Sequence, residues 1–181
     1  DTRSVIEKAV EAEIGVVEDF ENYKDNWVLE NATAHVVSSG AFGGEKSLAV
    51  TPSSSWATVG YTLSPTDYSK VTAITFKASA GVYVLQLISG SNVVEKQFAC
   101  AADGDITGVN VSELEPQNSS MNKDLTKIDY VRIGIKDKSG ATVLIDDFTL
   151  SDKEFVPADH SAKMIADFEN GMTFEDVFTA Q

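Results

Sequence analysis

Acidic residues near the two ends of the predicted domain are the first candidates for chemistry. Glu21 belongs to the first predicted strand, and Asp146 and Asp147 belong to the last. The first and last strands of a β-sandwich are often neighbours, and calcium prefers hard oxygen ligands. Two adjacent carboxylates repel each other unless a cation or hydrogen bonds hold them. These residues therefore predict either a calcium site or acids that are simply solvated at the strand ends.

Polar and aromatic residues with the pattern of outward strand positions are the second candidates. Trp56 is expected to point outward from a strand, and outward polar side chains are expected at Gln86, Gln97, Arg132 and Lys136. An exposed aromatic ring can stack on the C–H face of a sugar while polar groups bind its hydroxyls. Two simpler interpretations stay open: Trp56 is buried under a loop, and Arg132 only forms a surface ion pair.

Catalytic motifs are not found in the sequence. The two histidines, His35 and His160, belong to no metal-protease or nucleophile motif. The glycine-rich stretch 40–44 lacks the lysine and the following helix of a phosphate loop. Carboxylates are abundant, but no pattern pairs two of them for glycoside hydrolysis. We expect a protein that is not an enzyme, with a small jelly-roll hydrolase as a minor alternative.

Short β-type segments are expected to position these residues. They are rich in Val, Ile, Thr and aromatic residues and are separated by turn residues. The expected strands are a first strand that starts with 16–20 and includes Glu21, followed by 32–38, 46–51, 56–63, 71–78, 82–88, 95–101, 106–111, 130–136 and 142–151. So many short strands without a long helix between them predict an all-β fold, an antiparallel sandwich or barrel. Alternation places Ile74 and Phe76, and also Val131, Ile133 and Ile135, on the core side.

The ends of the chain have a different pattern. Residues 1–15 carry apolar residues at helical spacing and predict a linker or short helix, whereas 152–164 predict a second linker. The tetrapeptide Asp19-Phe20-Glu21-Asn22 returns as Asp167-Phe168-Glu169-Asn170, at a spacing of about one small domain. We interpret 16–151 as one module and 165–181 as the opening of a second, truncated module.

The composition of the chain argues against some classes of binding partner. The chain has 181 residues and a net charge of −14, which disfavours nucleic acid because phosphate binding needs a basic surface. No apolar run reaches transmembrane length, so membrane insertion is not expected. Cys100 is the only cysteine, which excludes an internal disulfide, and we expect it to be a small buried apolar residue.

Three motifs in chain order resemble the β-jelly-roll carbohydrate-binding modules of the galactose-binding-like superfamily, most closely the glucan-binding modules of family 11. The motifs are Val17–Glu21 with the following Trp27, Gly43–Val50 and Leu144–Leu150. The resemblance covers about residues 16–151. It implies a jelly roll, a glycan cleft on the outer face of one sheet, and a structural calcium bound by the Glu21 carboxylate, the Lys46 carbonyl and the Asp146 carboxylate.

We therefore expect a non-catalytic carbohydrate-binding module of a secreted or cell-surface, multimodular protein. It would bind a polysaccharide such as a β-glucan, or an oligosaccharide, and raise the local concentration of an attached enzyme at the polymer. The alternative is a structural or adhesive spacer repeat without a glycan site, whose partners are neighbouring modules of the same polypeptide. An outward Trp56 favours glycan binding, and a Trp56 packed under a loop favours the spacer.

Overall fold

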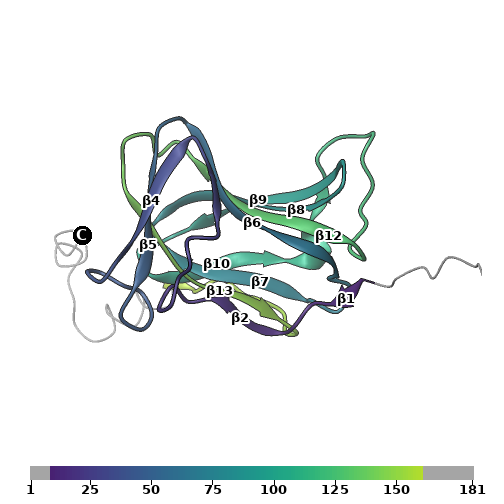
Figure 1. Ribbon diagram of the computed structural model, residues 1–181, viewed down its shortest axis with the longest axis horizontal. Coiled ribbons are helices and arrows are strands. Elements are labelled where there is room, and N and C mark those ends of the chain that lie inside the picture. The colour runs from purple at the N-terminus through teal and green to yellow at the C-terminus, as the bar shows by residue number, and fades with distance from the viewer. Residues whose placement is uncertain (1–8, 161–181) are drawn as a thin grey trace, which may run out of the picture.

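Two β-sheets packed face to face form the protein, as expected for a jelly roll (Figure 1). The structure is a computed structural model, and it describes residues 9–160. The seven-stranded sheet contains β1 (Val10–Glu11), β3 (Val28–Glu30), β6 (Trp56–Asp67), β8 (Gly81–Ser89), β9 (Asn92–Cys100), β11 (Glu115–Pro116) and β12 (Ile128–Lys136). The six-stranded sheet contains β2 (Gly15–Glu18), β4 (Ala32–Val37), β5 (Ser47–Pro52), β7 (Ala73–Ala78), β10 (Asp105–Asn110) and β13 (Val143–Ser151).

Strand order follows mainly from pairing between strands far apart in sequence, although β4–β5 and β8–β9 join consecutive strands. The path of the seven-stranded sheet is β1-β6-β12-β8-β9-β11, with β3 beside β6; the other path is β10-β7-β13-β5-β4, with β2 beside β13. Each pairing is antiparallel except the short β1–β6 pair. The expected contact between the first and last strands of the module is present as β2–β13. A 3₁₀ turn, Val111–Glu113, follows β10.

The core lies between the sheets and confirms the predicted alternation. Ile74 and Phe76 of β7 are buried, as are Val131, Ile133 and Ile135 of β12. Successive strand residues point to opposite faces, so these positions share the inner face of their sheet. Cys100 is also buried, as predicted.

An aromatic cluster closes one part of this core. The Trp27 ring packs edge-on against Phe20 and Phe148, with centroid distances of 5.4 and 5.7 Å. The Tyr61 ring completes the cluster 5.4 Å from Trp27. Trp27 and Tyr61 therefore belong to the core and its rim.

The predicted ends of two strands, the first strand and β6, were wrong. The first strand ends at Glu18, because Phe20 has a left-handed φ of 62° that no strand continues through. Glu21 consequently lies in a turn after the strand and not within it. In the other sheet, β6 continues to Asp67, past its expected end at residue 63, since Thr66 is paired on both sides, with Ile128 and with Val10.

The N-terminal part forms a strand where a helix was one of two expectations. Val10–Glu11 pairs in parallel with Thr66–Asp67. Val10 is 75% exposed, so it does not form part of the buried apolar face that the helical spacing predicted. The sequence also missed β3 and β11. Within residues 9–160, no helix is long and apolar enough to cross a bilayer.

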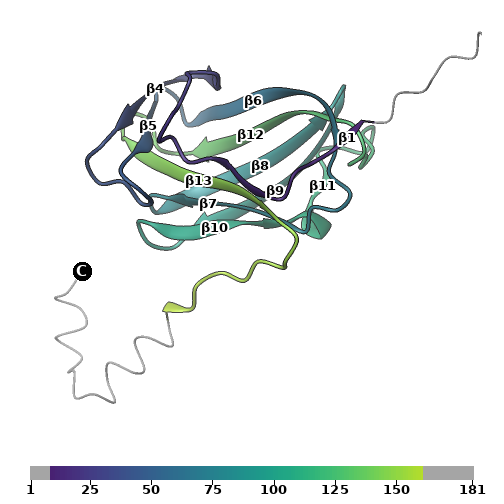
Figure 2. The same ribbon diagram turned by 60° about the horizontal axis from the view of Figure 1, so that its bottom comes forward.

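The segment after β13 is held against the module (Figure 2). The Asn110 side chain donates to the Phe155 carbonyl at 3.0 Å and accepts from its N–H at 2.7 Å. His160 Nε2 lies 2.6 Å from Asp105 Oδ2, at the other end of β10. The described part of the expected 152–164 linker is thus fixed along the edge strand β10. The expected second module opening, 165–181, lies outside the described residues.

Candidate functional site

The five residues proposed from the sequence to bind a ligand share the outer face of the seven-stranded sheet. Trp56 lies opposite Lys136, and Arg132 lies opposite Gln86. Gln97 lies opposite Val84 on the next strand pair. Because β6, β12, β8 and β9 are consecutive in this sheet, residues far apart in sequence form one continuous surface.

A row of side-chain contacts crosses this face. Arg132 Nε donates to Gln86 Oε1, and Gln86 Nε2 donates to Glu95 Oε2 at 3.1 Å. On the other side, Arg132 Nη1 and Thr58 Oγ1 reach Glu30 Oε2 at 3.5 and 3.2 Å. We call these five residues, from β3, β6, β12, β8 and β9, the polar row.

Arg132 is the centre of the polar row. Its guanidinium also lies over the Tyr130 ring, 5.9 Å from the centroid, which adds a cation–π contact. The surface ion pair of Arg132 that was the simpler interpretation is present, with Glu30 as its partner; the two side chains are 20% and 52% exposed, so the pair contributes little stability. The main effect of these contacts is to hold the guanidinium in one orientation on the sheet.

Gln86 is not the accessible polar group that the sequence suggested. It points outward as predicted, yet it is only 1% exposed. Arg132 and Glu95 use its two amide atoms and cover it. Its role in this geometry is to orient Arg132, because a buried amide with both ends occupied has little left to offer a ligand.

The Trp56 ring is half-buried and lies against Gly134 on the outer face of the sheet. A Cβ added at Gly134 would lie 2.2 Å from the Trp56 Cη2 atom, so the six-membered part of the indole rests directly on this glycine. Trp56 also lines a shallow pocket of about 440 Å³ together with Val84, Glu95, Lys96, Gln97 and Lys136. Any larger residue at Gly134 would push the ring off the surface.

Lys136 and Gln97 form the border of this pocket. Lys136 Nζ donates to Gln97 Oε1 at 2.9 Å. An ammonium bonded to a neutral amide keeps two further N–H donors for other partners. The pocket thus combines an aromatic surface with donors at its border, beside the polar row.

The carboxylates proposed to bind calcium lie on either side of a tight loop. Glu21 Oε1 accepts the backbone N–H groups of Glu45 and Lys46, each at 2.9 Å. Lys46 Nζ donates to the Glu21 carbonyl at 3.3 Å. A Cβ at Gly44 would lie 2.3 Å from Glu21 Oε1, and Gly44 has a φ of +58°, so glycine is required there.

Asp146 is fully buried and has three hydrogen bonds. Its Oδ2 accepts from the Gly43 N–H and the Ser47 hydroxyl at 2.8 Å each, and its Oδ1 accepts from the Asp147 N–H at 2.8 Å. Burial raises the pKa of Asp146, and these hydrogen bonds oppose that shift. We call Glu21, Asp146 and the loop 43–47 the acidic corner.

Repulsion between the adjacent carboxylates of Asp146 and Asp147 is offset by groups of the protein itself. Asp147 Oδ2 lies 3.0 Å from Lys77 Nζ, which also donates to the Phe42 carbonyl. Among residues 9–160, no group of three or more His, Cys, Asp or Glu side chains is arranged to hold a metal ion. The expected set is smaller, two carboxylates and the Lys46 carbonyl, and both carboxylates already accept protein hydrogen bonds. Calcium at this corner therefore stays a prediction.

Four residues of the site were missed in the sequence. Glu30 was not found because β3 has only three residues and no clear alternation. Glu95 and Thr58 could have been found, since each alternates with a residue already assigned outward, Gln97 and Trp56. Gly134 gives no signal by itself, because its role depends on the ring that lies above it.

Comparison with known proteins finds similarity in structure only. No family model matches the sequence, and no curated protein matches it. The structure is similar to the family 11 carbohydrate-binding module of a cellulosomal cellulase from Clostridium thermocellum, with a TM-score of 0.64, 15% identity, and coverage of 82% of this chain and 98% of the other.

Two further structures support the same fold. A family 11 module of Clostridium thermocellum in complex with a β-1,3-1,4-mixed-linked tetrasaccharide gives a TM-score of 0.61 at 15% identity, over 77% of this chain and 97% of the other. An exo-β-agarase gives 0.61 at 15% identity, over 81% of this chain but only 26% of the enzyme. The chain therefore has the jelly-roll fold of carbohydrate-binding modules of this type, and the predicted resemblance is confirmed for the fold.

Proposed function

We propose that this protein is a non-catalytic carbohydrate-binding module, and that it binds a polysaccharide such as a β-glucan on the outer face of the seven-stranded sheet. The observation that carries the proposal is the Trp56 indole resting on Gly134 beside the polar row. The carbohydrate-binding modules of the same fold support this function by analogy.

The physical fit is between a flat sugar ring and the Trp56 side of the face. The indole offers an apolar surface for the C–H groups of one sugar, and Val84 lines the same pocket. The contacts of Arg132 within the described residues use Nε and Nη1, which leaves Nη2 to donate to sugar hydroxyls. Lys136 and Gln97 offer further polar groups at the border of the pocket.

The arrangement also indicates how such a module would work. A single aromatic surface gives modest affinity for one sugar, so repeated contacts along a polymer suit it better than a free monosaccharide. In a secreted or cell-surface multimodular protein, modest affinity is enough to raise the effective concentration of an attached enzyme at the polymer. Neighbouring modules of the same polypeptide, with 165–181 as the opening of one, belong to this proposal.

A structural calcium at the acidic corner is part of the same proposal. The Glu21 and Asp146 carboxylates and the Lys46 carbonyl supply hard oxygen ligands from three separate parts of the chain. Calcium there would tie the first turn and the last strand to the loop 43–47 and would stabilise the fold without contacting the ligand.

Affinity gel electrophoresis tests the glycan site. Mixed-linked glucan, xyloglucan, mannan and xylan are cast into native gels, and wild type is compared with Trp56→Ala. We expect at least one polymer to retard wild type and not the variant. Ile106→Ala, which removes a 51% exposed apolar side chain from the other sheet, is the matched control and should be retarded like wild type.

Melting curves accompany the gels, so that lost binding is not confused with lost folding. Retardation that persists in a folded Trp56→Ala protein would contradict the proposed position of the site. No retardation by any polymer would contradict glycan binding and favour the structural or adhesive spacer.

A further inference from the structure

The repeated tetrapeptide gives the chain two copies of the segment that opens the module. The first copy is Val17–Asn22, and the second is Ile165–Asn170. An apolar pair precedes Glu18 in the first copy and Ala166 in the second, Val16-Val17 and Met164-Ile165 respectively. The second copy lies outside the described residues.

Phe20 is the residue that anchors the first copy. Its side chain is fully buried, and its ring packs edge-on against Tyr23 and Trp27 at 5.3 and 5.4 Å. The left-handed φ of 62° turns the chain so that the ring enters the core directly after the strand. Asp19 Oδ1 accepts the Glu21 N–H at 3.1 Å and stabilises this turn.

Glu21 is the second anchor. Its carboxylate accepts both N–H groups of Glu45 and Lys46, as described for the acidic corner. Together, Asp19, Phe20 and Glu21 make the contacts that recognise this segment, and the second copy repeats all three types as Asp167, Phe168 and Glu169.

The strand before these anchors is held weakly. Within β2, Val16 is 60% exposed and Val17 is 42% exposed. Its pairing with β13 comprises three residue pairs with a register shift among them. A short strand with few pairs and little burial opens at low free-energy cost.

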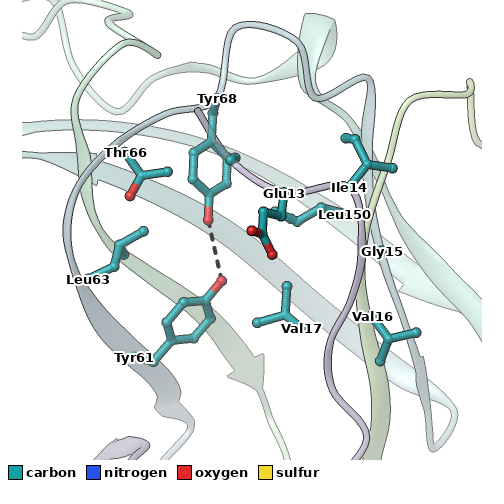
Figure 3. Close-up of a pocket in the computed structure, with 11 residues that line it drawn as sticks. Glu13, Ile14, Gly15, Val16, Val17, Tyr61, Leu63, Thr66, Tyr68 and Leu150 are labelled. Carbon is teal, nitrogen blue, oxygen red and sulfur yellow. Dashed lines mark hydrogen bonds between the residues drawn. The ribbon is translucent and has the colours of Figure 1, made fainter. Parts of the chain in front are cut away.

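Hollows lie on both sides of β2. One pocket of about 330 Å³ is lined by residues of β2 and β6, and Val17 lies on its Tyr61 side (Figure 3). Another pocket of about 330 Å³ lies on the side of β7 and β10 and is lined by Val16 and Ile106. We call the place that Val17–Asn22 occupies, beside β13 and against the loop 43–47, the slot. The hollows leave room beside β2 for a segment that enters or leaves this slot.

We propose that the slot of the first copy also accepts the second copy, donated by another molecule of this chain. Phe168 would occupy the Phe20 position in the aromatic cluster, and Glu169 would accept the N–H groups of Glu45 and Lys46. Position 18 becomes Ala166, so the bond from the Phe20 N–H to Glu18 Oε1 at 2.7 Å has no counterpart. The chain's own copy is therefore favoured at low concentration.

The exchange links molecules head to tail, since the donated tail and the accepting slot are different surfaces. Contacts of this kind can continue from one molecule to the next without closing. Strand donation of this type uses main-chain pairing for affinity and buried side chains for specificity. The exchange does not depend on glycan binding, because β2 lies in the six-stranded sheet and the proposed glycan face belongs to the seven-stranded sheet.

A double-mutant comparison in the full chain tests the exchange. Phe20→Ala empties the slot of its anchor, Phe168→Ala removes the donor, and the third variant carries both changes. We expect Phe168→Ala alone to melt like wild type. Phe20→Ala should form concentration-dependent oligomers in sedimentation velocity, and adding Phe168→Ala should return it to a monomer and lower its Tm further, by about 4 °C or more.

Two controls keep the outcome interpretable. Phe174→Ala removes a phenylalanine outside the repeat and should leave the oligomers of Phe20→Ala unchanged. If Phe20→Ala does not fold, the milder Phe20→Leu takes its place in all pairs. Equal Tm values and monomers for the single and double variants would overturn the proposal, and so would a Phe168-dependent rescue that stays monomeric.

Discussion

The polar row and the acidic corner are both built around charged side chains, but their partners differ. In the polar row, Arg132 and Gln86 are held mainly by other side chains on an open face. In the acidic corner, Glu21 and Asp146 are held mainly by backbone N–H groups, those of Glu45 and Lys46 on Glu21 and those of Gly43 and Asp147 on Asp146. The comparison indicates that the row can vary without loss of the fold, whereas the corner fixes a loop and two chain segments together.

The largest expected effect is on stability at the acidic corner. Asp146→Ala leaves the N–H groups of Gly43 and Asp147 and the Ser47 hydroxyl without their acceptor, which should lower the free energy of unfolding by about 3 kcal/mol. Urea denaturation measures this change. Asp147→Asn is the control, because its pair with Lys77 is partly exposed and should be worth less than about 1 kcal/mol.

Calcium removal also tests the contribution of the acidic corner to stability. If calcium binds at Glu21, Lys46 and Asp146, a concentration 100-fold above Kd stabilises the protein by about 2.7 kcal/mol, and excess EGTA should lower Tm accordingly. Differential scanning calorimetry with calcium, with EGTA and with magnesium measures the shift. An unchanged Tm in EGTA would show that the hydrogen bonds of the corner are sufficient by themselves.

At the polar row, the change should appear in binding and not in stability. Arg132→Met keeps the aliphatic part of the side chain and removes its donors, so affinity for the retained polymer should fall by about 1.5 kcal/mol or more. The lost ion pair with half-exposed Glu30 should change stability by less than about 1 kcal/mol. Isothermal titration and urea denaturation of the same variant separate the two. A large loss of stability with unchanged affinity would show that Arg132 supports the fold and does not bind the polymer.

The smallest expected effect comes from Gly134. Gly134→Ala places a methyl group where the Trp56 ring lies, so the ring must move, and affinity should fall by about 1 kcal/mol while the fold is retained. Titration with the polymer measures the loss, and Trp fluorescence reports the displaced ring. Gly90→Ala is a control for space, because nothing lies within 4 Å of a Cβ at Gly90, although its positive φ makes a small loss of stability expected there.

The sequence located the outward face better than it located its environment. Alternation placed Trp56, Arg132 and Lys136 outward correctly, because side-chain direction in a strand is a local property. It also placed Gln86 outward, but Gln86 is buried by residues from β12 and β9. Glu30 was missed for a related reason, since β3 exists only through its pairing with β6.

By itself, the sequence determined the all-β class, the alternation of the long strands, the burial of Cys100 and the neighbouring positions of the first and last strands of the module. These follow from spacing and from the need to bury one face of each strand. Only the tertiary structure decided the left-handed turn at Phe20, the length of β6, the polar row and the contact of Trp56 with Gly134. Each of these depends on residues brought together from distant parts of the chain, and a local sequence pattern does not specify which distant residues it will contact.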